Sequence, residues 1–139
     1  MQTFIPYGTD FHATAKVLDR QRLGKQRVEG LQILNTLTGR SRGWRNHPAV
    51  KMWAGYADVL ADYTLSICEH WVSLGYKDTV ADKVRALGLR TITPDLPAFL
   101  YDEEVIISHR SNLIRKLPQH YGVLWADVPD DIPYKWVVS

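Results

Sequence analysis

The sequence has a single cysteine, Cys68, among its 139 residues, so the chain forms no internal disulfide. Cys68 lies in an apolar helical pattern, and this setting predicts a buried structural thiol. The sequence also lacks an apolar run of about 18 residues, the minimum for a membrane-spanning helix. Its first residues do not have the basic-then-apolar pattern of a signal peptide. We therefore expect a cytoplasmic protein that does not enter a membrane.

Motifs for metals and common cofactors are missing as well. The His, Cys, Asp and Glu residues are not spaced as metal ligands, and there is neither a phosphate-binding glycine loop nor a nucleophile elbow. If the protein is an enzyme, we expect it to work without a metal or cofactor. The nucleophiles that remain are a lysine or the terminal amine, and α-amines are weaker bases than lysine, so a larger share is neutral at pH 7.

The apolar residues follow helical periodicity, and no strand pattern is present. We predict one compact all-α domain over residues 1–139, with three main helices, long loops and a monomeric state. The apolar side of the first helix is expected to include Val17, Val28, Leu31 and Leu34, with Gly24 at a bend or a close approach. The expected elements are an extended lead-in over residues 1–10, main helices over 13–37, 48–73 and 101–116, a short helix over 78–87, a loop over 91–97 and an irregular tail after 118.

Basic residues are concentrated in the first part of the chain. Residues 1–51 contain nine Lys and Arg against three Asp and Glu, although the net charge of the whole chain is only +2. On a helix, Gln21, Arg22 and Glu29 fall on nearly the same side, and Lys25 is nearby. A carboxylate on a cationic face indicates chemistry on a polyanion, because the cations hold phosphates while the acid acts on what they hold. Alternatively, Lys25 and Glu29 form an ordinary i,i+4 pair on a solvated helix.

A basic loop precedes the second predicted helix. Two glycines allow a close approach to a ligand, arginines can donate to phosphate oxygens, and Trp44 can stack on a base or wedge into a duplex. His47 can contact phosphate or act as an acid, or it can cap the helix or pack against it. The alternative for the whole loop is a solvated segment with Trp44 folded onto the core. The residues predicted to contact nucleic acid here are Arg42, Trp44, Arg45, Asn46 and His47.

The third candidate is the polar run Ser-His-Arg-Ser-Asn over residues 108–112, together with Lys116. His109, Asn112 and Lys116 share a helix face whose donors suit phosphate, and Arg110 belongs to the same run. The alternative is the polar side of a helix whose inner side is formed by Ile106, Leu113 and Leu117.

Taken together, these segments resemble the pyrimidine-dimer DNA glycosylase family. Residues 18–23, Leu-Asp-Arg-Gln-Arg-Leu, with Glu29 eight residues after Gln21, resemble the family's first helix. Residues 39–48 resemble its basic loop, residues 74–78 the end of its second long helix, and the aromatic tail also has a counterpart. Residues 42–48 and 109–113 look most like the phage and bacterial branch of the family.

The resemblance implies an all-α, metal-free DNA glycosylase with abasic-site lyase activity on duplex DNA. It implies that a terminal amine attacks the sugar C1′ and forms an imine, that Glu29 assists, and that Gln21 contacts DNA near the lesion. Position 2 is Gln, which is too large for removal of the initiator Met, so we expect the amine to be that of Met1. Val28 and Gln32 stand where the family has arginines, and Arg22, Lys25 and Arg27 supply cations from other positions.

Two other functions are compatible with the same residues. One is a DNA-binding protein on the same fold that lacks catalysis. The other is an enzyme acting on nucleotides or RNA, with Glu29 and His47 as acid and base.

Overall fold

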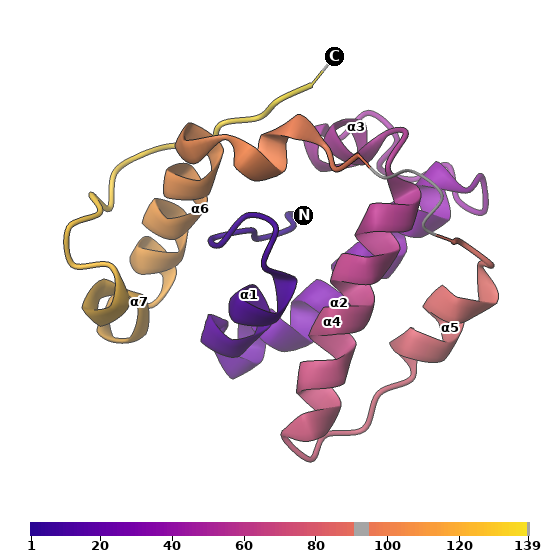
Figure 1. Ribbon diagram of the computed structural model, residues 1–139, viewed down its shortest axis with the longest axis horizontal. Coiled ribbons are helices and arrows are strands. Elements are labelled where there is room, and N and C mark those ends of the chain that lie inside the picture. Colours follow the sequence, from indigo (N-terminus) through magenta and orange to yellow (C-terminus); the bar gives the residue numbers. More distant parts are fainter. Residues whose placement is uncertain (91–94, 139) are drawn as a thin grey trace.

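The computed structural model describes residues 1–90 and 95–138 (Figure 1), and in these residues it contains helices and no strands. The prediction of an all-α fold is therefore confirmed. No helix in this part of the chain is long and apolar enough to cross a membrane. The elements are α1 (Phe11–Val17), α2 (Arg20–Leu37), α3 (Pro48–Trp53), α4 (Ala57–Ser73), α5 (Val80–Ala86), the 3₁₀ helix η1 (Ala98–Tyr101), α6 (Glu103–Lys116) and α7 (Pro118–Leu124).

The N-terminal lead-in is not helical, as expected, and it runs through the middle of the molecule. Figure 1 shows it between α1 and α2 on one side and α6 on the other. Ile5 is fully buried and Phe4 is nearly so, which makes this segment part of the hydrophobic core. The Asp10 side chain then accepts a hydrogen bond from the Ala13 N–H, and this N-cap starts α1.

The single long helix predicted over residues 13–37 is wrong, because the chain breaks between α1 and α2. Leu18 and Asp19 are extended, with ψ of 133° and 161°. The Tyr121 hydroxyl accepts the Asp19 N–H at 2.8 Å and donates to the Asp19 carboxylate. The break is therefore held by a side chain about a hundred residues away, in α7.

The second predicted helix, over residues 48–73, is also divided. α3 ends at Trp53, and α4 starts at Ala57 after a turn through Gly55, whose φ is +84°. The C-terminal end of α4 follows the prediction: Gly75 has a φ of +95° and donates its N–H to the Val72 carbonyl.

α2 and α4 pack closely through glycines. A Cβ on Gly30 would lie 2.4 Å from Thr64 Oγ1, and one on Gly24 would lie 3.1 Å from the Trp71 ring, which confirms the close approach expected at Gly24. The predicted apolar side of the first helix is partly wrong, because Val28 is 45% exposed. The buried side of α2 is formed by Leu23, Gln26, Gly30, Ile33 and Leu34.

Cys68 in α4 is buried, as predicted, and burial raises the pKa of its thiol to about 12. The short helix expected over residues 78–87 is α5. Part of the loop expected over residues 91–97, residues 91–94, lies outside the described residues, and residues 95–97 are not helical.

α6 was predicted within two residues of its observed start. The Asp102 side chain caps it by accepting the Glu104 and Val105 N–H groups, and Arg115 and Lys116 lie in its last turn. The tail after residue 118 was expected to be irregular, but it opens with α7. Pro118 occupies the first turn of α7, and the buried Tyr121 and Trp125 stack at 5.6 Å between ring centroids.

Candidate active site

The first residues of the chain are fixed by a series of side-chain acceptors. The Gln2 N–H donates to Glu29 Oε2 at 3.0 Å, and the Phe4 N–H donates to Gln26 Oε1 at 2.8 Å. Between and after them, the Thr3 N–H donates to Gln2 Oε1 and the Ile5 N–H donates to His109 Nδ1. Every backbone N–H from residue 2 to residue 5 thus has a side-chain partner, so the position of the N-terminus is determined by α2 and α6.

Gln26 is the centre of this network. Its Nε2 donates to the Gln2 carbonyl at 2.8 Å and to Glu29 Oε2 at 3.1 Å. The Tyr63 hydroxyl lies 2.7 Å from Gln26 Oε1 and also 2.7 Å from the Phe4 carbonyl, and it donates its proton to one of them. Gln26 is 1% exposed, so its amide holds the N-terminal segment and the Glu29 carboxylate in one buried arrangement.

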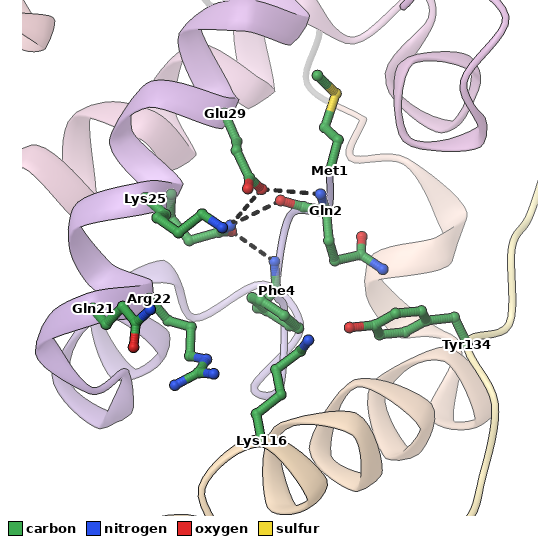
Figure 2. A pocket seen from close by; sticks show the side chains of 10 residues that line it. Met1, Gln2, Phe4, Gln21, Arg22, Lys25, Glu29, Lys116 and Tyr134 are labelled. Carbon is green, nitrogen blue, oxygen red and sulfur yellow. Dashed lines mark hydrogen bonds between the residues drawn. The ribbon is translucent and has the colours of Figure 1, made fainter.

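These residues form one side of a solvent-open cleft of about 230 Å³. Figure 2 shows Glu29, Lys25 and Arg22 entering it from α2, Met1 and Gln2 from the N-terminus, and Lys116 and Tyr134 from the opposite side. The helix spacing that predicted a shared side for Gln21, Arg22 and Glu29 is confirmed, since all three line the cleft. The complete lining is Met1, Gln2, Phe4, Gln21, Arg22, Lys25, Gln26, Glu29, Lys116 and Tyr134.

Positive charge predominates in the cleft. Arg22, Lys25 and Lys116 line it, and Glu29 is the one carboxylate among the lining residues. Arg22 also pairs with Asp19 at 3.2 Å, which orients its guanidinium. No ion pair between Lys25 and Glu29 is found in residues 1–90 and 95–138, so the alternative of an ordinary helix-surface pair is not what the structure contains. The arrangement can hold a polyanion while a carboxylate faces it.

Two further groups respond to the charges of the cleft. Burial lowers the pKa of His47, the Met1 ammonium lowers it further and Glu29 opposes both effects, so His47 lies within electrostatic reach of the site. Burial raises the pKa of Tyr134 to about 12, which keeps its hydroxyl protonated at neutral pH. His47 is also the N-cap of α3, because its Nδ1 accepts the Ala49 N–H at 3.0 Å. The capping alternative for His47 is therefore confirmed, and in this role Nδ1 is unprotonated.

The basic loop before α3 is on the surface. Arg42, Trp44, Arg45 and Asn46 are exposed, and Trp44 retains 55% of its accessible surface. The alternative in which Trp44 folds onto the core is therefore wrong. Its ring instead contacts the edge of His47, with centroids 6.0 Å apart.

The predicted phosphate-binding face of α6 is largely wrong. His109 is 1% exposed and Asn112 is 8% exposed. Burial lowers the pKa of His109 to about 3, so this imidazole is neutral at any ordinary pH. Asn112 donates to the Ser108 and Ile132 carbonyls. Of the predicted set, Lys116 reaches the cleft.

Arg110, the remaining member of that set, is partly buried against the N-terminal segment. Its Nε donates to the Pro6 carbonyl at 2.8 Å, and its guanidinium lies over the rings of Tyr7 and Trp125. Arg27 is engaged in a similar way. It pairs with Asp78 and lies over Trp71, so it joins α2 to α5 and α4 rather than offering a free cation.

The polar run on α6 binds the chain's own C-terminal segment. Ser111 Oγ accepts the Ile132 N–H at 2.9 Å, and Ser108 Oγ accepts the Lys135 N–H at 3.1 Å. These bonds place Tyr134 between them, against His109 and at the wall of the cleft. The two serines and the asparagine of this run therefore bind the C-terminal segment to α6.

Sequence reasoning missed Gln2, Phe4, Gln26 and Tyr134 as site residues. Gln26 lies three residues before Glu29, so helix periodicity indicates that the two side chains are close. The sequence does not indicate that this glutamine is buried, because glutamine is usually exposed. Tyr134 comes from a segment without periodicity, and no local pattern indicates its place at the cleft. No group of three or more His, Cys, Asp or Glu side chains able to hold a metal ion occurs in the part of the chain that the structure describes.

Comparison with known protein families identifies a match. Residues 1–84 match the family model described as pyrimidine dimer DNA glycosylase. This segment runs from Met1 through α4 into α5, and it contains Gln21, Arg22, Lys25, Gln26 and Glu29. Neither the curated proteins nor the solved structures include a match.

Proposed function

The chain belongs to the pyrimidine dimer DNA glycosylase family, and we propose that it excises damaged pyrimidines from duplex DNA with the Met1 α-amine as nucleophile and then cuts the strand as an abasic-site lyase. The observation that carries the proposal is the 3.0 Å hydrogen bond from the Gln2 N–H to Glu29. Because Met1 is one peptide unit from that N–H, its amine belongs to the same corner of the cleft as the carboxylate.

The proposed reaction starts with attack of the neutral amine on the sugar C1′. The C1′–N bond breaks, and its electron pair leaves with the base. The nitrogen loses a proton, and the departing base takes one up. The C1′–O4′ bond then breaks as O4′ is protonated, which opens the ring and leaves a protonated imine between Met1 and C1′. Removal of a C2′ proton expels the 3′ phosphate oxygen, and this β-elimination cuts the strand. Water then hydrolyses the imine and restores the amine.

Glu29 suits two steps of this sequence. Its carboxylate stabilises positive charge that develops at the sugar, and it accepts or returns a proton at the amine or the ring oxygen. Arg22, Lys25 and Lys116 supply the cations that hold the flanking phosphates.

Borohydride trapping tests the proposal directly. Borohydride reduces an imine to a stable protein–DNA adduct, and mass spectrometry of the adduct peptide identifies the amine. Two substrates are needed: a duplex with a thymine dimer and a duplex with an abasic site. We expect an adduct at Met1 with both duplexes, without added metal.

Other outcomes separate the alternatives. An adduct at Lys25 or Lys116 would retain the lyase chemistry and overturn the assignment of Met1. An adduct with the abasic duplex alone would move the substrate to another damaged base. Binding of both duplexes without any adduct would indicate a DNA-binding protein that lacks catalysis.

A further inference from the structure

Trp44 combines two unfavourable features. Its φ is +67°, the one positive value found for a residue other than glycine in residues 1–90 and 95–138. Its ring is also 55% exposed, although burial of an indole is strongly favourable. A residue that has both a disfavoured backbone and an exposed aromatic ring points to a contact absent from the free protein.

The loop holds Trp44 in this orientation through its own hydrogen bonds. Thr36 Oγ1 donates to the Gly43 carbonyl at 2.7 Å, and the His47 N–H donates to the Trp44 carbonyl at 2.8 Å. The first bond ties the residue before Trp44 to α2, and the second closes a turn into α3. The indole is thus presented on a fixed backbone.

A row of rings connects Trp44 with the cleft. The Trp44 ring meets His47 at 6.0 Å, His47 meets Trp136 at 5.8 Å, and Trp136 meets Tyr134 at 5.6 Å between centroids. Tyr134 lines the cleft on the side opposite Glu29. In Figure 1 the yellow C-terminal segment, which carries Tyr134 and Trp136, passes along α6 toward the part of the molecule where α3 lies. The indole is therefore held at a set distance from the reacting centre.

The surface around Trp44 is cationic. Arg42 and Arg45 flank it in sequence and are exposed, as is Arg40 at the start of the loop. Exposed arginines on both sides of an aromatic ring match the chemistry of duplex DNA, in which phosphates flank a stack of flat, apolar bases.

We propose that Trp44 inserts into the DNA base stack beside the damaged nucleotide and fills the space left when a base is unstacked. The inference rests on the proposed function, because that function identifies the nucleotide beside which Trp44 inserts. The insertion itself does not require the glycosylase or lyase reaction. An aromatic ring between base steps is a sequence-independent contact, so this residue would help to open the duplex without selecting the flanking bases.

The test compares Trp44→Ala with Trp44→Phe. The matched control is Leu124→Ala, because Leu124 is 48% exposed and lies on α7, at the other end of the molecule from α3 in Figure 1. The first readout is the fluorescence of 2-aminopurine placed next to a non-cleavable abasic analogue in a duplex. We expect the wild type, Trp44→Phe and Leu124→Ala to increase the 2-aminopurine fluorescence on binding. The increase caused by Trp44→Ala should be smaller than that of the wild type by a factor of at least about five.

The second readout is strand cutting at abasic sites. We expect Trp44→Ala to lower the rate on duplex DNA by about ten-fold and to leave the rate on single-stranded DNA within about two-fold of the wild type. Equal losses on both substrates, or an unchanged duplex rate, would overturn the insertion. Thermal melting shows whether Trp44→Ala remains folded. If it does not, Trp44→Gly serves as the second variant, because it also removes the ring and glycine suits the φ of +67° at this position.

The two proposals fail in different ways. If the wild type forms no imine adduct but still raises the 2-aminopurine signal through Trp44, the glycosylase chemistry is wrong and the insertion stands. If an adduct forms at Met1 while the signal does not depend on Trp44, the chemistry stands and the insertion is wrong.

Discussion

Glu29 accepts the backbone N–H of Gln2 at 3.0 Å, so one carboxylate both holds the N-terminal segment and faces the cleft. The carboxylate proposed to act on the substrate is therefore also the group that positions the residue after the proposed nucleophile, Met1. Loss of Glu29 can affect the position of the N-terminus and the chemistry together. A variant that separates these two effects is therefore needed.

Glu29→Gln makes this separation. A glutamine oxygen still accepts the Gln2 N–H, but the amide cannot exchange protons or carry charge. We expect strand cutting to fall by about 10²–10⁴-fold, the range for loss of a general acid or base, while the affinity for DNA stays within about three-fold. A cleavage assay and a binding titration on one abasic duplex measure both effects. Loss of binding together with activity would contradict the role assigned to Glu29.

An N-terminal extension should remove chemistry without disturbing the fold. Adding Gly-Ser before Met1 converts the amine to an amide, which is not a nucleophile. The N–H groups of residues 2–5 keep their partners, so we expect an unchanged melting temperature together with loss of borohydride trapping and strand cutting. Proteolytic removal of the extension back to Met1 should restore both. Full activity of the extended protein would exclude the Met1 amine as the required nucleophile.

The part of this site that lies on α2 could be predicted from the sequence because it depends on local periodicity. Residues 21, 22, 25 and 29 recur at helical spacing, and the pattern places them together whatever packs around them. Lys116, which was predicted to contact phosphate together with His109 and Asn112, reaches this cleft from the last turn of α6 without those two residues.

What could not be predicted depends on contacts between distant segments. Asp19 is the N-cap of α2 and an aspartate favours this position, but one such residue inside a helical pattern does not establish a break, and the break is held by the distant Tyr121. His109 and Asn112 have the composition of an exposed polar helix face, but the N-terminal segment and the tail cover them. A polar side chain that binds another part of the backbone looks, in sequence, the same as one that binds a ligand.

The buried amide of Gln26 should dominate the stability of the site. Gln26→Leu retains the volume but leaves the Phe4 N–H and the Gln2 carbonyl without their partner. Each unsatisfied buried group costs about 1–3 kcal/mol, so we expect the free energy of unfolding to fall by about 2–5 kcal/mol. Urea denaturation measures it. The control is Gln32→Leu, since Gln32 is an exposed glutamine on the same helix, and its substitution should change stability by less than about 0.5 kcal/mol.

The contact between α2 and α4 should tolerate no side chain at position 30. The Cβ of Gly30→Ala would lie 2.4 Å from Thr64 Oγ1 and 2.9 Å from its Cγ2. We expect destabilisation by about 1–3 kcal/mol, measured by thermal or urea unfolding. Thr64→Ala in the same chain should relieve much of it, because both close atoms are removed.

Gly122 provides the matched control for this substitution. It lies in α7, and a Cβ there would meet no atom within 4 Å. Gly122→Ala should therefore leave stability unchanged or raise it by up to about 1 kcal/mol through helix propensity. Equal destabilisation at both positions would indicate that steric contact with Thr64 is not the cause.

His109 should make the protein less stable as the pH falls. Burial lowers its pKa to about 3 in the folded state, whereas an unfolded chain binds this proton near pH 6.5. Between these values the unfolded state holds one more proton, so the free energy of unfolding is greatest above pH 6.5 and decreases toward pH 3. One such group contributes a slope of about 1.4 kcal/mol per pH unit.

Comparison with His109→Asn isolates this contribution. The asparagine oxygen can accept the Ile5 N–H in place of Nδ1, but it does not titrate. We expect urea unfolding between pH 5 and 7 to show a shallower pH dependence in the variant, by up to about 1.4 kcal/mol per unit.

His47, whose pKa burial also lowers, is present in both proteins, and its effect cancels in the difference. Tyr134, which faces His109, has its pKa raised to about 12 by burial and does not titrate in this window. Parallel curves for the two proteins would show that His109 is protonated equally in the folded and unfolded states, which its complete enclosure by the N-terminal segment and the tail argues against.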